Sequence, residues 1–200
     1  MSPLPDRSAL GLRERKKAQM RETIQSFALQ LMREQGYAAT TVEQIITGVD
    51  VSESTFFRYF PTKESLVLSD EFDPIILEAF LAQPTDISVM SALRNAMRSL
   101  FAGLSAEALA DQRERVNLVV QVPSLRSAML DQFSETMTVL SRAIAERTDR
   151  AADDFVIRVV AGAVIGAAMA ILTAMADDPS ADIAELMDRA MEQLEGGLSL

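Results

Sequence analysis

Two consecutive short helices constrain what this chain can fold into more than any other feature of its sequence. The run TTVEQ, in which either Thr40 or Thr41 can be the N-cap of a capping box, begins a helix that ends near Gly48. Ser52 is a good N-cap for a second helix, which must end before Pro61 because the residue before a proline is disfavoured in the helical conformation. The sequence therefore predicts two helices of about two turns each, joined by a four-residue turn.

Helical signals also precede and follow this pair. Apolar residues at positions 20, 24, 27, 28 and 31 predict a long amphipathic helix over 13–35, ended by Gly36. Further prolines and glycines separate apolar segments to the end of the chain. We therefore expect an all-α fold of about nine helices, in which six follow the pair: 62–82 with a kink at Pro74, 86–103 from Asp86, 105–121, 124–148 from Ser124, 153–177 from Asp153, and 180–195 from Ser180.

The composition excludes several kinds of site. Of the 200 residues, 48% are apolar and 24% are charged, as in a globular protein with a core. The chain has no Cys and no His, so we expect no cofactor and no metal, and the commonest general base is missing. Two carboxylate pairs, Asp153-Asp154 and Asp177-Asp178, fall at predicted helix ends, where capping explains them better than acid–base catalysis. No enzyme activity is predicted.

Charge is distributed unevenly along the chain. The formal net charge is −10, yet residues 1–63 carry nine Lys or Arg against seven Asp or Glu, whereas residues 64–200 carry ten against twenty-two. A basic N-terminal segment on an acidic body is typical of a protein that contacts a polyanion at one end, although a solvated helix start explains the pattern equally well. The N-terminus has no apolar segment of a secretory signal, so we expect a cytoplasmic protein.

The pair of short helices has the layout of a helix-turn-helix. In that motif the second helix enters the major groove of DNA with its first residues at the base edges. Here those residues are Ser52–Thr55, whose small hydroxyl side chains can bind base or phosphate. Phe56 and Phe60 are four positions apart and would pack the helix onto its neighbours, whereas Phe57 and Tyr59 would face outward. The alternative interpretation is an ordinary helical hairpin with an aromatic core.

Residues 40–67, TTVEQIITGVDVSESTFFRYFPTKESLV, resemble the DNA-binding segment of TetR-family transcriptional regulators. The shared features are Thr41-Val42, Ile45, Val51-Ser52, Thr55 with two aromatic residues, Arg58-Tyr59-Phe60, and Pro61-Thr62-Lys63-Glu64-Ser65-Leu66. The segment departs from the family at Ile46, Asp50 and Phe57, where Ala, Gly and often Tyr are usual. The resemblance covers residues 12–67. It implies a DNA-binding domain over 1–62 and a helical ligand-binding and dimerisation domain over 63–200.

The resemblance also implies contacts with DNA. Phosphate contacts are expected from Thr41, Tyr59 and Lys63, and contacts with bases or phosphates from Ser52, Ser54 and Thr55. The sequence adds Phe57, limited to an apolar contact, and the basic residues Arg13, Lys16 and Lys17. A symmetric homodimer would bind a near-palindromic double-stranded operator, with an affinity that falls by orders of magnitude as salt rises several-fold.

Residues 159–176, VVAGAVIGAAMAILTAMA, form an uncharged segment just long enough to span a membrane. The segment is rich in Ala and Gly rather than Leu and has no flanking basic cluster, so we expect a buried helix and no membrane partner. The family resemblance places it at the interface of a homodimer. The expected interface residues are Val160, Val164, Ala168, Ile171, Met187 and Met191.

Met- and Phe-rich residues of the middle helices predict a helical core, and the resemblance implies a cavity for a small apolar effector among them. The candidate lining residues are Ile76, Phe80, Met97, Phe101, Asn117, Gln121, Met129, Phe133 and Met137. The combined prediction is a repressor that leaves its operator when the effector binds, with the helix over 62–82 as the lever between domains. The alternatives are a helical carrier or enzyme that does not bind DNA, and a regulator that binds a protein.

Overall fold

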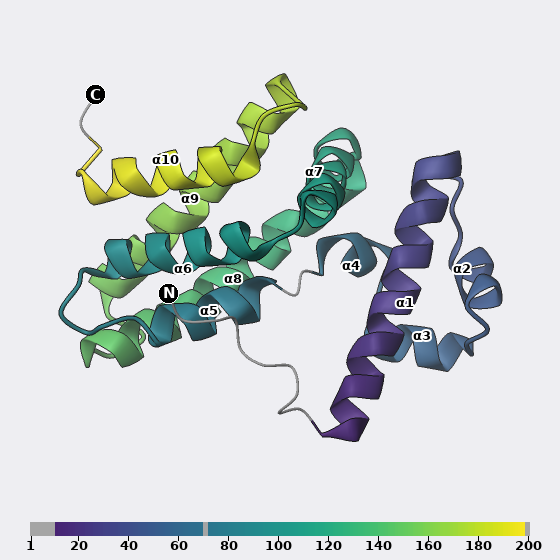
Figure 1. The fold of residues 1–200 in the computed structure, drawn as a ribbon, viewed down its shortest axis with the longest axis horizontal. Helices are drawn as coiled ribbons and strands as arrows, with labels where there is room; N and C mark the ends of the chain where they lie inside the picture. Colours follow the sequence, from purple (N-terminus) through teal and green to yellow (C-terminus); the bar gives the residue numbers. More distant parts are fainter. Residues whose placement is uncertain (1–10, 70–71, 199–200) are drawn as a thin grey trace. The chain divides into compact units, whose positions relative to one another are not determined.

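The computed structural model of this chain describes residues 11–69 and 72–198 (Figure 1). Over those residues it contains ten helices and no strand, which confirms the all-α prediction. The helices belong to two compact units, one that ends at Ser69 and one that follows it. Each unit has its own apolar core.

The first unit consists of a long helix and three short ones. They are α1 (Leu12–Gln35), α2 (Val42–Gly48), α3 (Glu53–Tyr59) and α4 (Lys63–Leu68). The N-cap of α2 is Thr41, whose Oγ1 accepts a hydrogen bond from the Gln44 amide at 3.2 Å, while Gln44 Oε1 accepts one from the Thr41 amide at 2.9 Å. Thr40 is buried instead, and its hydroxyl donates to the Gly36 carbonyl. The sequence left both caps open, and the structure selects the second.

All four helices contribute to the core of the first unit. Its fully or nearly fully buried side chains are Ile24, Ala28, Met32, Ile45, Phe56, Phe60, Leu66 and Val67. One polar side chain is buried with them: Gln25 Nε2 donates to the carbonyls of Leu66 and Ser69, both at 2.8 Å. These bonds satisfy carbonyls at the end of α4, which a helix leaves without partners of its own. Helix α4 therefore packs with the first unit, although the sequence placed the domain boundary before it.

The second unit contains six helices. They are α5 (Phe72–Leu81), α6 (Val89–Gly103), α7 (Ala106–Gln121), α8 (Pro123–Thr148), α9 (Phe155–Asp177) and α10 (Ile183–Glu195). Three of them begin two or three residues later than predicted, because Ser88, Asp154 and Asp182 accept hydrogen bonds from the first backbone amides. Helix α8 begins at Pro123, one residue before the predicted Ser124, since proline suits the first helical position.

The prediction of one helix over 62–82 is wrong. Helix α4 ends at Leu68, where Ser69 has extended backbone angles (φ −66°, ψ 120°), and α5 begins at Phe72. Pro74 kinks no continuous helix and lies instead in the first turn of α5, where its missing N–H is not needed. A single rigid helix therefore does not join the two predicted domains.

The second unit has two apolar clusters. The larger includes Phe80, Leu93, Ile144, Ile157 and Met191, and the smaller includes Val116, Ile171, Met175 and Ile183. The connection between α5 and α6 is fixed by Arg147, which donates to the carbonyls of Gln83 at 2.9 Å, Pro84, and Ile87 at 3.3 Å. Helix α9 packs against both α8 and α10, and α10 also packs along α6 (Figure 1).

Helix α9 is apolar almost throughout. In the described part of the chain it is the one helix long and apolar enough to cross a membrane, with a mean hydropathy of 2.4 over its most apolar window. The core helix of a soluble protein satisfies the same criterion. Only 22% of that window is buried within the subunit, so much of α9 remains available to a further apolar partner.

Candidate nucleic-acid interface

The turn between α2 and α3 depends on two particular residues. Asp50 has a left-handed φ of 53°, which Asp adopts less readily than Gly but more readily than most residues. Gly48, at the end of α2, lies against Phe27 of α1, and a Cβ at this glycine would lie 2.1 Å from the ring Cζ. The departure at Asp50 is visible in the sequence, whereas the role of Gly48 is not, because its contact is made with a different helix.

Three hydroxyl side chains lie together at the start of α3. Ser52 Oγ accepts a hydrogen bond from the Thr55 amide at 3.2 Å, donates to Thr55 Oγ1 at 2.8 Å, and lies 3.1 Å from Ser54 Oγ. Ser52 and Ser54 are exposed and Thr55 is half-buried. The structure thus brings the three residues predicted to contact bases or phosphates into one small polar surface, the α3 hydroxyl surface. Such small side chains allow the helix start to approach another molecule closely.

The aromatic residues of α3 divide as predicted. Phe56 and Phe60 are fully buried, which confirms that they anchor the helix. Phe57 is 41% exposed, and its ring lies edge-on to that of Phe56 at a centroid distance of 5.3 Å. Tyr59 is half-buried, and the Arg58 guanidinium lies 5.3 Å from its ring centroid. Phe57 therefore leaves part of an apolar ring exposed on α3, and the Phe56 ring supports it.

Lys63 differs most from expectation among the predicted phosphate contacts. Its ammonium donates to the Tyr37 carbonyl and lies 4.0 Å from the centroid of the Tyr37 ring. Desolvation lowers the pKa of Lys63, and neighbouring Glu64 partly opposes that change. In this structure the ammonium is occupied within its own unit, so a phosphate would have to share it with Tyr37 or replace that contact.

Glu64 completes the arrangement around Lys63. The Tyr37 hydroxyl donates to Glu64 Oε1 at 2.8 Å. Burial raises the pKa of Glu64, but hydrogen bonds from its own backbone amide, from Tyr37 and from Thr62 outweigh burial and leave the pKa below its usual value. Glu64 is therefore ionised at neutral pH and helps to keep the Lys63 ammonium in place.

Basic side chains near the start of α1 are exposed to solvent. Lys16 and Lys17 are exposed, whereas the side chain of Arg13 is outside the described part of the structure. Arg21, which was not among the predicted contacts, donates from Nη1 to the Tyr59 carbonyl at 3.3 Å and lies 4.8 Å from the Phe60 ring centroid. The sequence feature that could have identified Arg21 is its position in the basic N-terminal segment. Arg21 connects α1 directly to the end of α3.

The residues predicted to line an effector cavity do not gather around one space. Phe80 is fully buried in the larger cluster of the second unit, with Ile76, Met97 and Met137 packed against it. Gln121 is exposed at the last residue of α7, and Met129 and Phe133 are half-buried on α8. Asn117 donates to the Pro179 carbonyl at 3.3 Å, and its buried Oδ1 has no partner among the described residues.

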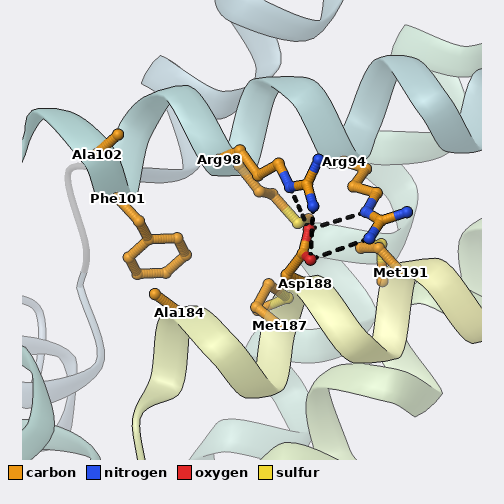
Figure 2. Close-up of a pocket in the computed structure, with 9 residues that line it drawn as sticks. Arg94, Arg98, Phe101, Ala102, Ala184, Met187, Asp188 and Met191 are labelled. Atoms are coloured by element: carbon orange, nitrogen blue, oxygen red, sulfur yellow. Dashed lines mark hydrogen bonds and ion pairs between the residues drawn. The ribbon is translucent and has the colours of Figure 1, made fainter.

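A cavity of about 230 Å³ lies between α6 and α10 (Figure 2). Two predicted pocket residues, Met97 and Phe101, line it. Met187 and Met191, which were predicted at the dimer interface, also line it. Periodicity did not reveal this arrangement because the apolar face of α10 could equally have been turned toward a second subunit.

The predicted dimer residues differ in their exposure. Val164, Ile171 and Met191 are buried inside the subunit. Val160 and Ala168 are half-buried. The exposed large apolar residues of α9 are Phe155, Val156, Val159 and Met169, and a Cβ added at Gly166 would meet no neighbouring atom within 4 Å. An apolar helix gives no sequence signal for which of its faces is the inner one.

Both units match known proteins. Residues 24–69 match the family model of bacterial regulatory proteins of the TetR family. Residues 87–199, more than half of the chain, match the model of the MftR C-terminal domain. The HTH-type transcriptional regulator TcmR of Streptomyces glaucescens is 33% identical over 151 residues, which are 72% of this chain and 67% of TcmR. MftR of Mycobacterium tuberculosis (strain H37Rv) is 22% identical over 197 residues, 98% of each chain.

A solved structure gives the same fold. FadR of Thermus thermophilus, a TetR-family transcriptional repressor in complex with lauroyl-CoA, is 22% identical, with a TM-score of 0.54 over 90% of this chain and 95% of FadR. TetR-family proteins are transcriptional regulators rather than enzymes, bind operator DNA, and are in general soluble and cytoplasmic. The matches in both units, together with the helix-turn-helix of α2 and α3, show that this chain belongs to the TetR family of transcriptional regulators.

Proposed function

We propose that this chain is a repressor that binds a near-palindromic operator as a homodimer and leaves it when a small apolar effector binds. The observation that carries the proposal is the α3 hydroxyl surface. It lies at the N-terminal end of a helix that the buried rings of Phe56 and Phe60 anchor to the core of the first unit. A helix start of this kind fits the major groove, which is about 12 Å wide in B-DNA.

Phosphate contacts would hold α3 in register on the duplex. Thr41 lies at the exposed N-terminus of α2, and Lys16 and Lys17 are exposed on α1. Tyr59 carries a hydroxyl that can donate to a phosphate, and Phe57 offers its edge to a sugar or a thymine methyl group. Because the whole chain has a net charge of −10, its acidic part opposes unspecific binding and leaves these groups to provide affinity.

The dimer surface in this proposal is the exposed face of α9, called here the α9 outer face and defined by Phe155, Val159, Gly166 and Met169. Phe155 is 77% exposed and Val159 is 52% exposed, which is unusual for such side chains in a soluble protein unless a partner covers them. Gly166 leaves room for the backbone of a second α9 to approach. Two half-sites bound by one dimer explain why the operator should be near-palindromic.

Release by an effector follows from a shift between two states of the dimer. The effector must bind more tightly to the state in which the two α3 helices do not match successive major grooves. The apolar core of the second unit and the lauroyl-CoA bound by FadR both favour a hydrophobic effector. Spin labels on exposed positions of α1 in each subunit provide the test. The shift is refuted if an effector that releases DNA leaves the distance between labels unchanged.

DNA binding itself is tested by selection of duplexes from a random pool at moderate salt, followed by fluorescence anisotropy. We expect an enriched near-palindrome and an affinity that falls about 10³-fold or more between 50 and 200 mM salt. If no sequence is enriched and no duplex binds, the proposal is wrong.

The dimer surface is tested by sedimentation of Val159→Glu, which places a charge on the α9 outer face. We expect the dimer to dissociate and operator affinity to fall with it. The matched control is Leu130→Glu, a change at an equally exposed apolar residue of α8. A Val159→Glu protein that remains dimeric would exclude this face as the interface.

A further inference from the structure

The cavity between α6 and α10 joins an apolar wall to a charged one. Figure 2 shows Phe101 and Ala184 at one end, and Arg98, Asp188 and Arg94 at the other. Three methionines, Met97, Met187 and Met191, contribute to the apolar lining. A site with apolar walls and a few convergent polar groups is the usual form of a small-molecule site in proteins.

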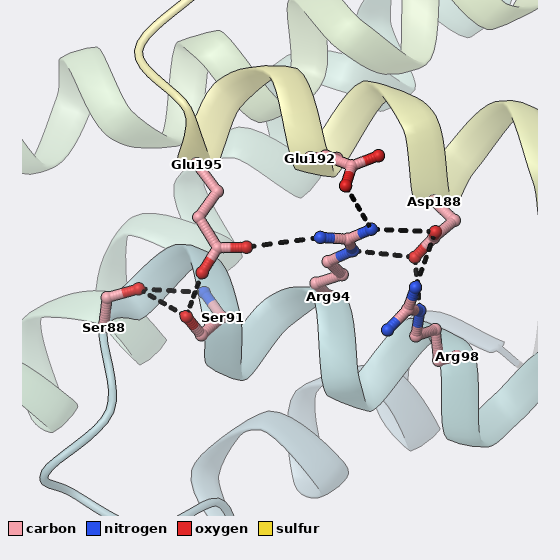
Figure 3. Close-up of polar contacts among 7 residues, drawn as sticks. All are labelled: Ser88, Ser91, Arg94, Arg98, Asp188, Glu192 and Glu195. Atoms are coloured by element: carbon pink, nitrogen blue, oxygen red, sulfur yellow. Dashed lines mark hydrogen bonds and ion pairs between the residues drawn. The ribbon is translucent and has the colours of Figure 1, made fainter.

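The charged wall is built around one carboxylate held by two guanidinium groups (Figure 3). Arg94 donates from Nε to Asp188 Oδ1 at 2.8 Å and from Nη2 to Oδ2 at 2.9 Å. Arg98 donates from Nη2 to Asp188 Oδ2 at 2.8 Å, and its Nε also contacts Oδ1. The guanidinium groups at this wall therefore already bind a carboxylate, because planar guanidinium and carboxylate groups can form two parallel hydrogen bonds.

The two arginines differ in what remains available to a ligand. The Arg94 side chain is 14% exposed and also forms ion pairs with Glu192 at 3.4 Å and Glu195 at 3.5 Å. The Arg98 side chain is 56% exposed, and its contacts with Asp188 use Nε and Nη2 and leave the two donors of Nη1 uninvolved. Arg98 is therefore the residue that can bind an additional anion at the cavity mouth.

We propose that this cavity binds a small amphipathic monocarboxylate, with its carboxylate on Arg98 and its apolar part among Met97, Phe101 and Met187. A volume of about 230 Å³ is below the usual ~300–1,000 Å³ of drug-sized sites, so the apolar part is short. Asp188, Glu192 and Glu195 surround the arginines and disfavour a doubly charged phosphate more than a singly charged carboxylate. Methionine side chains adapt to either an alkyl or an aryl group.

Binding would act on the packing of α6 against α10. A ligand carboxylate on Nη1 shares the Arg98 guanidinium with Asp188, so it weakens one of the two arginine contacts that tie the helices together. The assignment of this site to the effector rests on the proposed function above, whereas carboxylate binding itself does not require DNA. Carboxylate binding at the cavity and operator binding can therefore be refuted independently.

The test uses the full chain with ¹³C-methyl methionine and no DNA, titrated with octanoate, octan-1-ol or octylammonium. Of the eleven methionines, we expect Met97, Met187 and Met191 to shift with octanoate in a saturable way, and to respond about tenfold more weakly to the other two probes. If octanoate shifts none of these three methyl groups, or if the alcohol binds equally well, the proposal is overturned.

Three variants sharpen the result. Arg98→Gln should weaken octanoate binding about tenfold, and Arg98→Lys should restore part of it. Arg189→Gln removes the same charge from an exposed position of α10 that does not line the cavity, and should leave octanoate binding unchanged. Equal affinity of Arg98→Gln and the unmodified protein would place the carboxylate elsewhere. Operator binding measured on the same proteins shows separately whether the proposed regulatory function holds.

Discussion

The two units of this protein are specified in different ways. In the first unit the core depends on a few large side chains at fixed positions, such as Phe56 and Phe60, and on caps at Thr41, Ser52 and Thr62. In the second unit the core is spread over many Ala, Met and Leu residues of long helices, which also enclose a cavity. A unit that must place one helix precisely on another molecule tolerates fewer changes than one that must accommodate a ligand.

The largest expected effect is that of Phe56→Ala. Removal of a fully buried ring should lower the unfolding free energy of the first unit by about 3–5 kcal/mol, which is enough to unfold a small domain. Hydrogen exchange resolved along the chain measures the loss of protection in α1–α4. Protection in α6–α10 should remain.

Phe57→Ala is the matched control, because removal of this exposed ring should lower the unfolding free energy by about 1 kcal/mol or less. Equal effects of the two changes would contradict the assignment of Phe56 as the anchor.

Gly48→Ala should have the next largest effect. The added methyl group would overlap the Phe27 ring, and overpacking of this kind costs about 1–3 kcal/mol, more than the gain of about 1 kcal/mol in helix propensity. Chemical denaturation followed by circular dichroism measures the change. The penalty should largely disappear in a Phe27→Leu background. An additive result in the double variant would mean that the two residues do not interact.

A smaller effect, confined to the second unit, concerns Asp188 and pH. Hydrogen bonds from Arg94 and then Arg98 hold the pKa of Asp188 far below the ordinary value of about 3.9. This carboxylate therefore contributes stability above about pH 4 that is lost progressively as the pH falls from there toward its much lower folded pKa. Asp188→Asn should lower stability at pH 7 and make the unfolding free energy change less between pH 4 and pH 2. An unchanged acid profile would show that the contact contributes nothing.

The smallest expected effect is a gain in stability on replacement of a left-handed Asp by Gly, and it should be similar in both units. Asp50 and Asp149 have left-handed φ values of 53° and 52°. Replacement of either residue by Gly should stabilise the protein by up to about 1 kcal/mol, because Gly adopts this conformation without a steric penalty. Thermal unfolding at one protein concentration measures both. If Asp50→Gly destabilises while Asp149→Gly stabilises, the Asp50 side chain has a role that its backbone conformation does not explain.

The contrast between units also explains how much could be predicted. In the first unit the limits of α2 and α3, the buried Phe56 and Phe60 and the exposed Phe57 follow from local caps and spacing, which a sequence displays directly. Gly48 against Phe27 and Lys63 beside Tyr37 could not be predicted, because both contacts join separate elements. In the second unit α9 is apolar on every side, so the sequence could not show that Val164 and Ile171 face inward while Phe155 and Val159 face outward.

The central claim is that the start of α3 reads DNA, and the most direct measurement is the operator affinity of Thr55→Ala combined with Tyr59→Phe. These changes remove one hydroxyl from the α3 hydroxyl surface and one expected phosphate contact in each subunit, while the anchors Phe56 and Phe60 stay. Thr23→Ala, at an exposed threonine of α1, is the control. We predict that the double variant remains folded and binds the selected duplex at least about tenfold more weakly, whereas the control binds normally. A folded double variant with unchanged affinity would show that α3 is not the reading helix.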